Sequence, residues 1–415
     1  MKRRDLLKYI GAGFLGAGLF ASGKPMRLSL PFARASAGKT LVVIFQRGGC
    51  DGLNVVVPYG DDEYYNLRPT IAVPLPGSSA RSALRLNGFF GLHPSLSGLF
   101  EIYNDGHLAV MPAVHYPDGN RSHFDSEVIV ESGSNRKLYD GWLGRYLESH
   151  LRRGTPLQAV VFGNVVPHAM RGKADVATFN DISKFGLGND DYSQRLLARL
   201  TEVYDQPVRP GDKNRFLLYE NGKMLLKNIE FMESLDLDHY EPQNGASYPN
   251  TSYGRQLMQV AQLIKLETGI ELATVDIGGW DTHSNQGGAQ ENGRHSIRLK
   301  EFSEGITALY KDLGRRMEDV LILTMTEFGR TAKQNASGGT DHGNASAWFA
   351  VGGQVHGGIY GDWPGLSESE LYKGRYLAHT VDCRDVMGEV LSNFLGASNM
   401  SHILPGHAYK PIGFL

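Results

Sequence analysis

Five residues with side chains suited to binding a metal ion stand in three short, glycine-rich segments. They are Asp51, Asp281, His283, Asp341 and His342. Asp341 and His342 are adjacent between glycines, where the backbone can bend tightly around an ion. Carboxylates combined with imidazoles form a mixed oxygen and nitrogen ligand set, which suits zinc or manganese better than calcium. We therefore expect one or two divalent ions at this site.

Ordinary structural roles are also open to these residues. Asp341 could cap a turn, and Asp51, which precedes a glycine, could be a turn residue. His283 could be a hydrogen-bonded core histidine. The metal hypothesis depends on all five residues meeting at one place in the fold.

Ser122 is the leading candidate for a nucleophile. It directly precedes an apolar-periodic stretch, so it is expected at the N-terminus of a helix. The alternative role is to cap that helix and nothing more. A hydroxyl there also lies in positive potential, near backbone N–H groups that favour an alkoxide or a bound phosphate. Ser126 and His123 compete for this role, as does a metal-bound hydroxide.

Three arginines, Arg47, Arg121 and Arg330, each lie beside one of these polar segments. A guanidinium can hold a tetrahedral oxyanion with two parallel hydrogen bonds, and we expect one of the three to do so. The alternative is that each pairs with a structural carboxylate such as Asp125 or Glu327.

Apolar runs indicate the elements that position these residues. Strands are expected at 40–46, 108–113, 158–162, 271–277, 320–325 and 348–351, and helices at 96–104, 124–131, 253–267, 296–317 and 383–395. Alternation of strands with helices predicts an α/β fold, with a mostly parallel central sheet covered by helices on both faces. Open sheets of this kind carry their sites at the carboxyl ends of the strands, which is where the polar segments fall.

Composition narrows the function further. The chain has 42 Lys and Arg against 44 Asp and Glu, so it lacks the field that would favour nucleic acid or an anionic membrane. Its two cysteines, Cys50 and Cys383, could form one disulfide bridge.

Residues 38–415 are expected to form one α/β domain with a helical insertion at about 190–250.

The first 37 residues resemble an export signal. Adjacent Arg3 and Arg4 precede an apolar run that is too short and glycine-rich to span a bilayer, and Ala35-Ser36-Ala37 supplies a cleavage site. This order predicts recognition by the twin-arginine export machinery. The mature protein is then expected in the periplasm or outside the cell, without stable membrane insertion.

Several motifs together resemble one bacterial family. They are RGGxDGLN at 47–54, RSHF at 121–124, GGWDTH at 278–283, TEFGRT at 326–331 and GTDHG at 339–343. In combination they are similar to the DUF1501 family, which is grouped with the alkaline phosphatase-like superfamily. The resemblance implies an alkaline phosphatase-like fold. It also implies that Asp51, Asp341 and His342 share one metal with the nucleophile, and that Asp281 and His283 bind a second.

Some features depart from that superfamily. Its second metal site has another late histidine, for which His356, His379, His402 and His407 compete, and Asp276 is an alternative to Asp281. The sulfatase maturation signature Cys-x-Pro-x-Arg is absent from the sequence.

The function expected from the sequence is an exported, metal-dependent hydrolase of small-molecule or polymer phosphate or sulfate esters. A phosphatase or phosphodiesterase is favoured over a sulfatase. The alternative is a non-catalytic envelope or extracellular binding protein that keeps the same scaffold.

Overall fold

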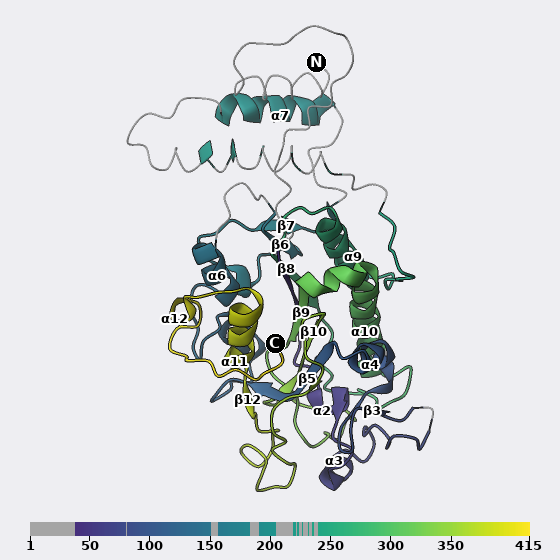
Figure 1. Ribbon diagram of the computed structural model, residues 1–415. Coiled ribbons are helices and arrows are strands. Elements are labelled where there is room, and N and C mark those ends of the chain that lie inside the picture. The colour runs from purple at the N-terminus through teal and green to yellow at the C-terminus, as the bar shows by residue number, and fades with distance from the viewer. Residues whose placement is uncertain are drawn as a thin grey trace. The chain divides into compact units, whose positions relative to one another are not determined.

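A computed structural model describes residues 38–79, 81–150, 157–182, 191–204 and 240–415, with the short pieces 219–220, 222–223, 226, 231 and 235 (Figure 1). The chain divides into two compact units. One consists of Ser36–Asp181 and Tyr240–Leu415 and contains both sheets described below. The other includes Ile182–His239, in which the structure describes helix α7 (Asp191–Tyr204).

The main sheet of the larger unit is mostly parallel. Its strands are β1 (Thr40–Gln46), β5 (Leu108–His115), β6 (Ala159–Phe162), β7 (Ala177–Phe179), β8 (Leu272–Ile277), β9 (Val320–Met325), β10 (Ser346–Gly352), β11 (Gly358–Ile359) and β12 (Val381–Asp382). They run in the order β11-β5-β10-β9-β1-β8-β6-β7, with β12 paired to β5. Only β10 is antiparallel to its neighbours, β5 and β9.

This topology gathers the polar segments at one edge of the sheet. Strand β1 is central, pairing in parallel with β8 and β9, so the loops after Gln46, Ile277 and Met325 leave from the same edge. Because β10 runs the other way, the segment that precedes Ser346 reaches that edge too. The segment that contains Asp341 and His342 therefore precedes a strand, and the reversal of β10 brings it to the same edge.

Alternating side chains of β1 face two different layers. Leu41, Val43 and Phe45 belong to a buried cluster with residues of α6 (Trp142–His150) and α11 (Cys383–Glu389). Helices α9 (Ser252–Lys265) and α10 (Arg294–Leu313) pack together on the opposite side of the sheet (Figure 1). The sheet is thus covered on both faces, which confirms the predicted fold class.

The remaining elements are short. They are α2 (Gly52–Val55), α3 (Asp62–Leu67), α4 (Ser97–Asn104), α5 (His123–Glu131) and α12 (Met400–Ile403), the 3₁₀ turns Pro94–Leu96, His168–Met170 and Gly314–Asp319, and a π-helical turn at Val390–Phe394. A small antiparallel sheet joins β2 (Val56–Val57), β4 (Gly91–Leu92) and β3 (Leu84–Arg85).

The six predicted strands and five predicted helices are all present, with boundaries that shift by a few residues. The predicted helix 296–317 ends at Leu313 and continues as a 3₁₀ turn, because Gly314 adopts a φ of 52°. Within the described residues, no helix combines the length and apolar character needed to cross a bilayer. The predicted export signal, 1–37, lies outside those residues, as does much of the predicted insertion, which stays a prediction.

Candidate metal centre

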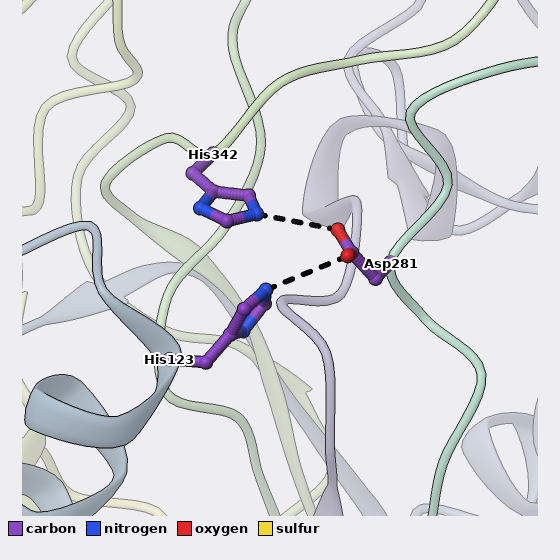
Figure 2. A group of neighbouring side chains, drawn as sticks. All are labelled: His123, Asp281 and His342. Atoms are coloured by element: carbon purple, nitrogen blue, oxygen red, sulfur yellow. Dashed lines mark hydrogen bonds and ion pairs between the residues drawn. The ribbon is translucent and has the colours of Figure 1, made fainter.

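Asp281 is the centre of a cluster of histidines at the polar edge of the sheet. Its Oδ1 lies 3.1 Å from Nε2 of His283 and 3.3 Å from Nε2 of His342. Its Oδ2 lies 3.7 Å from Nε2 of His123 at the start of α5. Figure 2 shows the rings of His123 and His342 directed at this carboxylate from two different segments.

Each of the three imidazoles is held through its other nitrogen. Nδ1 of His123 lies 2.7 Å from Oε1 of Glu327, and Nδ1 of His283 lies 3.1 Å from Oδ1 of Asp341. Nδ1 of His342 lies 2.8 Å from the backbone oxygen of Arg121. All three partners are acceptors, so a ring that binds a metal through Nε2 can carry its proton on Nδ1. In that tautomer every Nε2 has a free lone pair.

The three Nε2 atoms have few other partners. Nε2 of His123 is buried and has no hydrogen bond. The Nε2 atoms of His283 and His342 lie 3.0 Å apart, where two lone pairs repel unless a cation lies between them. One ligand atom each from His123, Asp281 and His342 fall within 4.8 Å of one another.

These separations fit a divalent ion. Tetrahedral zinc with Zn–N distances of about 2.0–2.1 Å keeps two ligand atoms about 3.3 Å apart. Histidine ligands of such ions typically donate their second nitrogen to a carboxylate or a carbonyl, as all three do here. The ligand atoms that all lie close to one another come from His123, Asp281 and His342, and His283 lies next to Asp281 and His342. This mixture of imidazoles and a carboxylate favours zinc, with manganese as the alternative.

Neighbouring charges tune the cluster. The hydrogen bond and the charge of Glu327 raise the pKa of His123, while burial lowers the pKa of His342. Partial burial alone would raise the pKa of Asp281, but the hydrogen bond and charge of Arg330 hold it below its usual value. Asp281 is therefore ionised at neutral pH.

Two glycines allow the loops to approach this closely. Gly48 has a φ of 121°, and a Cβ there would lie 2.8 Å from the backbone nitrogen of Asp281. A Cβ on Gly343 would lie 2.2 Å from the backbone oxygen of Arg330. Next to that glycine, Arg330 and His342 form an antiparallel bridge, which fixes His342 beside the loop that follows β9.

Asp51 has other partners. It is 1% exposed, and its oxygens accept hydrogen bonds of 2.6 and 2.8 Å from Arg68 and one of 2.5 Å from Gln286. Burial alone would raise the pKa of Asp51, but the charge and hydrogen bonds of Arg68 hold it below its usual value. The structure does not bring Asp51 into the histidine cluster, and its role as a ligand stays a prediction.

Asp341 contacts the cluster from outside. Its Oδ1 bonds Nδ1 of His283 and accepts a hydrogen bond from Asn335, and its Oδ2 lies 3.5 Å from Arg375. In this arrangement Asp341 orients the ring of His283, a candidate metal ligand. The division of the five predicted ligands between two ions also stays a prediction.

The two candidate serines differ in their surroundings. Ser122 is the N-cap residue of α5, as predicted, but its side chain makes no capping hydrogen bond. Ser126 is buried, and its hydroxyl donates to the backbone oxygen of Asn120 and contacts the hydroxyl of Tyr116. Ser122 therefore remains the better candidate nucleophile.

Two of the three candidate arginines are occupied by carboxylates. Arg47 pairs with Glu131 and Asp276, at 2.9 and 3.1 Å.

Arg330 is 1% exposed and donates to Asp281 at 2.7 Å and to the backbone oxygen of Thr340 at 2.7 Å. Arg121 differs, because its Nη1 is buried without a hydrogen-bond partner and its guanidinium lies 4.8 Å from the ring centre of Tyr376.

None of the late histidines joins the cluster identified among the described residues. His407 bonds Asp385 at 2.7 Å, His402 lies 4.0 Å from Glu148, and the ring of His379 lies 6.3 Å from that of His115. For His356, the structure gives a backbone hydrogen bond to Phe414. Cys50 and Cys383 are both buried and free.

The sequence did not reveal the roles of His123 and Glu327. His123 was predicted only as a competitor of Ser122 for the nucleophile, yet its Nε2 faces Asp281. Glu327 is fully buried and accepts hydrogen bonds from His123, from the backbone of Gly48 and from the hydroxyl of Thr326. Its position directly after an apolar strand was the available signal, but sequence alone offered it only as a partner for an arginine.

Replacing Glu327 by Gln is expected to weaken metal binding by about 10- to 100-fold, because the carboxylate orients His123 and makes its imidazole more basic. Competition with a chromophoric chelator measures the change. Glu131→Gln, which alters a buried carboxylate paired with Arg47, is the matched control. Equal metal affinities for the two variants would contradict this role.

A family model described as "Protein of unknown function (DUF1501)" matches residues 38–404 of the chain. No curated protein matches the chain.

Among solved structures, Ps i-CgsB in complex with k-i-k-neocarrahexaose is 9% identical, with 89% of this chain and 74% of that chain covered and a TM-score of 0.42. The zinc complex of the C-terminal periplasmic domain of EcEptC from Escherichia coli is 10% identical, with 91% of this chain and 89% of that chain covered and a TM-score of 0.40. Alkaline phosphatase from the Antarctic bacterium TAB5 is 8% identical, with 86% of this chain and 98% of that chain covered and a TM-score of 0.34. At these values none of the likenesses bears on the activity of this chain.

Proposed function

The chain belongs to the DUF1501 family, and we propose that it is an exported, metal-dependent hydrolase of phosphate or sulfate esters. The family description leaves the activity open, so the proposal rests on the residues of the site. The observation that carries it is the set of three imidazoles, each held at Nδ1, whose Nε2 atoms surround Asp281.

One divalent ion is the simplest occupant. His123, His283 and His342 would hold it together with Asp281, and Glu327 and Asp341 would orient two of the rings. A bound divalent ion polarises an ester oxygen and lowers the pKa of a coordinated water. Zinc is our first choice because nitrogen ligands predominate.

Residues beside the ion supply the rest of the chemistry. Arg121 has an unpartnered, buried N–H group, and its backbone oxygen bonds His342. Both observations support our assignment of Arg121 to binding a substrate oxyanion. Ser122, at the N-terminus of α5, is the proposed nucleophile, with water as the alternative. The substrate is a small-molecule or polymer ester, and a phosphoester is favoured because the sulfatase maturation signature is absent.

Export by the twin-arginine route completes the proposal. It is supported by the paired arginines and the Ala-x-Ala site of the first 37 residues. Fusion of those residues to a reporter, with Arg3 and Arg4 changed to lysine as the control, tests it.

The purified protein is expected to hold about one divalent ion per chain and to hydrolyse a chromogenic phosphomonoester or phosphodiester faster than a sulfate ester. Metal analysis and a panel of the three ester classes provide the measurement. An ion without turnover of any ester would favour the non-catalytic binding protein. A content of less than about one ion per chain, together with no turnover of any ester, would overturn the proposal that the protein is a hydrolase. Full activity in Ser122→Ala would shift the nucleophile to water.

A further inference from the structure

A polar groove of about 440 Å³ lies in the larger unit and shares no lining residue with the metal centre. About three turns of α10, from Lys300 to Lys311, form its floor. Its walls come from the N-terminal end of α4 with the residues just before it, from Arg81, and from loops near residues 245–247 and 289–291. Its volume falls within the range of about 300–1,000 Å³ that small-molecule sites occupy.

Two buried hydroxyls of α10 line this groove without hydrogen-bond partners. Ser303 is 2% exposed and Thr307 is 9% exposed, and neither side-chain oxygen has a partner. They are four residues apart, so they share one face of the helix. A buried polar group without a partner costs about 1–3 kcal/mol, so folded proteins keep few of them. Neither oxygen is exposed in this structure, and that of Thr307 lies against Gly98 of α4. Two of them among the lining of one groove indicate that a bound ligand supplies their partners once the side chains rotate toward it.

The charges around the groove balance. Its lining contains three basic and three acidic side chains, of which Lys311 pairs with Glu101 at 3.3 Å and Lys300 with Glu304 at 3.9 Å. Such a lining has no net field for an anion or a cation. It does offer hydrogen-bond donors and acceptors side by side.

The rest of the lining is hydroxylic or small. Five residues with hydroxyl groups line the groove, and none of the lining residues that the structure describes is aromatic. A flat apolar ligand would therefore find little to stack on, whereas a ligand rich in hydroxyl groups could both donate and accept along its length.

We propose that this groove binds a neutral, polyhydroxylated ligand of the size of a mono- or disaccharide. The hydroxyls of Ser303 and Thr307 hydrogen-bond to the ligand at the floor, and the lysines and glutamates bind its outer hydroxyls. The site is independent of the metal centre, and it stands whether or not the chain is a hydrolase.

Isothermal titration of the full chain with maltose, cellobiose and free N-acetylglucosamine tests the proposal, with a sugar phosphate and a zwitterionic amino acid as the charged probes. At least one neutral sugar is expected to bind, and more tightly than either charged probe. Asp281→Asn is expected to leave this binding unchanged, which separates the groove from the metal centre.

The double variant Ser303→Ala/Thr307→Val removes both hydroxyls and keeps their approximate shape. Binding is expected to weaken about tenfold, because two hydrogen bonds of about 0.5–1.5 kcal/mol each are lost. Thermal stability should stay equal or rise, since two unpartnered polar groups are removed. Ser247→Trp, on the rim, blocks the groove by bulk and should also abolish binding.

No binding of any neutral sugar would overturn the proposal. Tighter binding of the sugar phosphate would show an anion site instead, and unchanged affinity in the double variant would show that these hydroxyls do not contact the ligand.

Discussion

Asp281→Asn is expected to remove the bound ion and to lower ester hydrolysis by on the order of 10³-fold or more. The carboxylate of Asp281 lies within 3.7 Å of the Nε2 atoms of three histidines. It supplies the negative charge of this cluster, because an imidazole that binds a metal is neutral. The lost rate follows because a metal ion acting as a Lewis acid stabilises charge by several kcal/mol. Metal content by atomic emission and initial rates on the best ester provide the measurement.

Two matched carboxylates show whether this effect is specific. Asp341→Asn alters a residue that orients His283, and it should weaken metal binding by about 10- to 100-fold without abolishing it. Asp125→Asn removes a surface ion pair with Lys137 and should change neither metal content nor rate. Full metal content in Asp281→Asn would show that the histidine cluster is not the metal site.

Arg68→Met is expected to lower the free energy of unfolding by about 3–5 kcal/mol, because it leaves the buried carboxylate of Asp51 without its counter-ion. Both side chains are at most 1% exposed. Arg68 also donates to the backbone oxygens of Thr331 and Ala332, so its loss loosens the loop after β9. Urea unfolding at neutral pH measures the change, and Arg136→Met, on the exposed surface, should shift stability by less than about 0.5 kcal/mol.

The same ion pair predicts a pH dependence with a definite sign. The folded-state pKa of Asp51 lies below its ordinary value of 3.8, so the unfolded chain takes up the proton first as the pH falls. The stabilisation is therefore fully present above about pH 5 and is lost progressively as the pH falls through the folded-state pKa. Asp51→Asn should lack this acid-dependent component in urea titrations.

Asp51→Asn also separates the two roles considered for this residue. If Asp51 only pairs with Arg68, the folded variant should keep its metal and lose stability. Loss of metal from the folded variant would instead support the sequence-based assignment of Asp51 as a ligand.

The sequence was sufficient for the fold class because each buried strand is a continuous apolar run that ends at a polar loop. It was also sufficient to find the polar segments, but their partners depend on contacts between residues far apart in the chain. The pairing of Asp51 with Arg68 follows from the path of the chain through α3, which ends just before Arg68, and no local pattern encodes it. The pairing of Glu327 with His123 likewise arises only when β9 and the end of β5 reach the same edge.

The direction of β10 decided where Asp341 and His342 lie. An apolar run predicts a buried strand but not its direction, and Trp348–Val351 was expected within a mostly parallel sheet. Antiparallel pairing with β9 and β5 means that the residues preceding β10 reach the polar edge.

The three histidines come from segments that are far apart in the chain, at positions 123, 283 and 342. An ion held by them would act as a cross-link that closes two long loops and so reduces the conformational freedom of the unfolded chain. Both cysteines are free, so no disulfide between them plays that part. A chelator would then act on this protein much as a reducing agent acts on a disulfide-linked one, by removing a tie between distant parts of the chain.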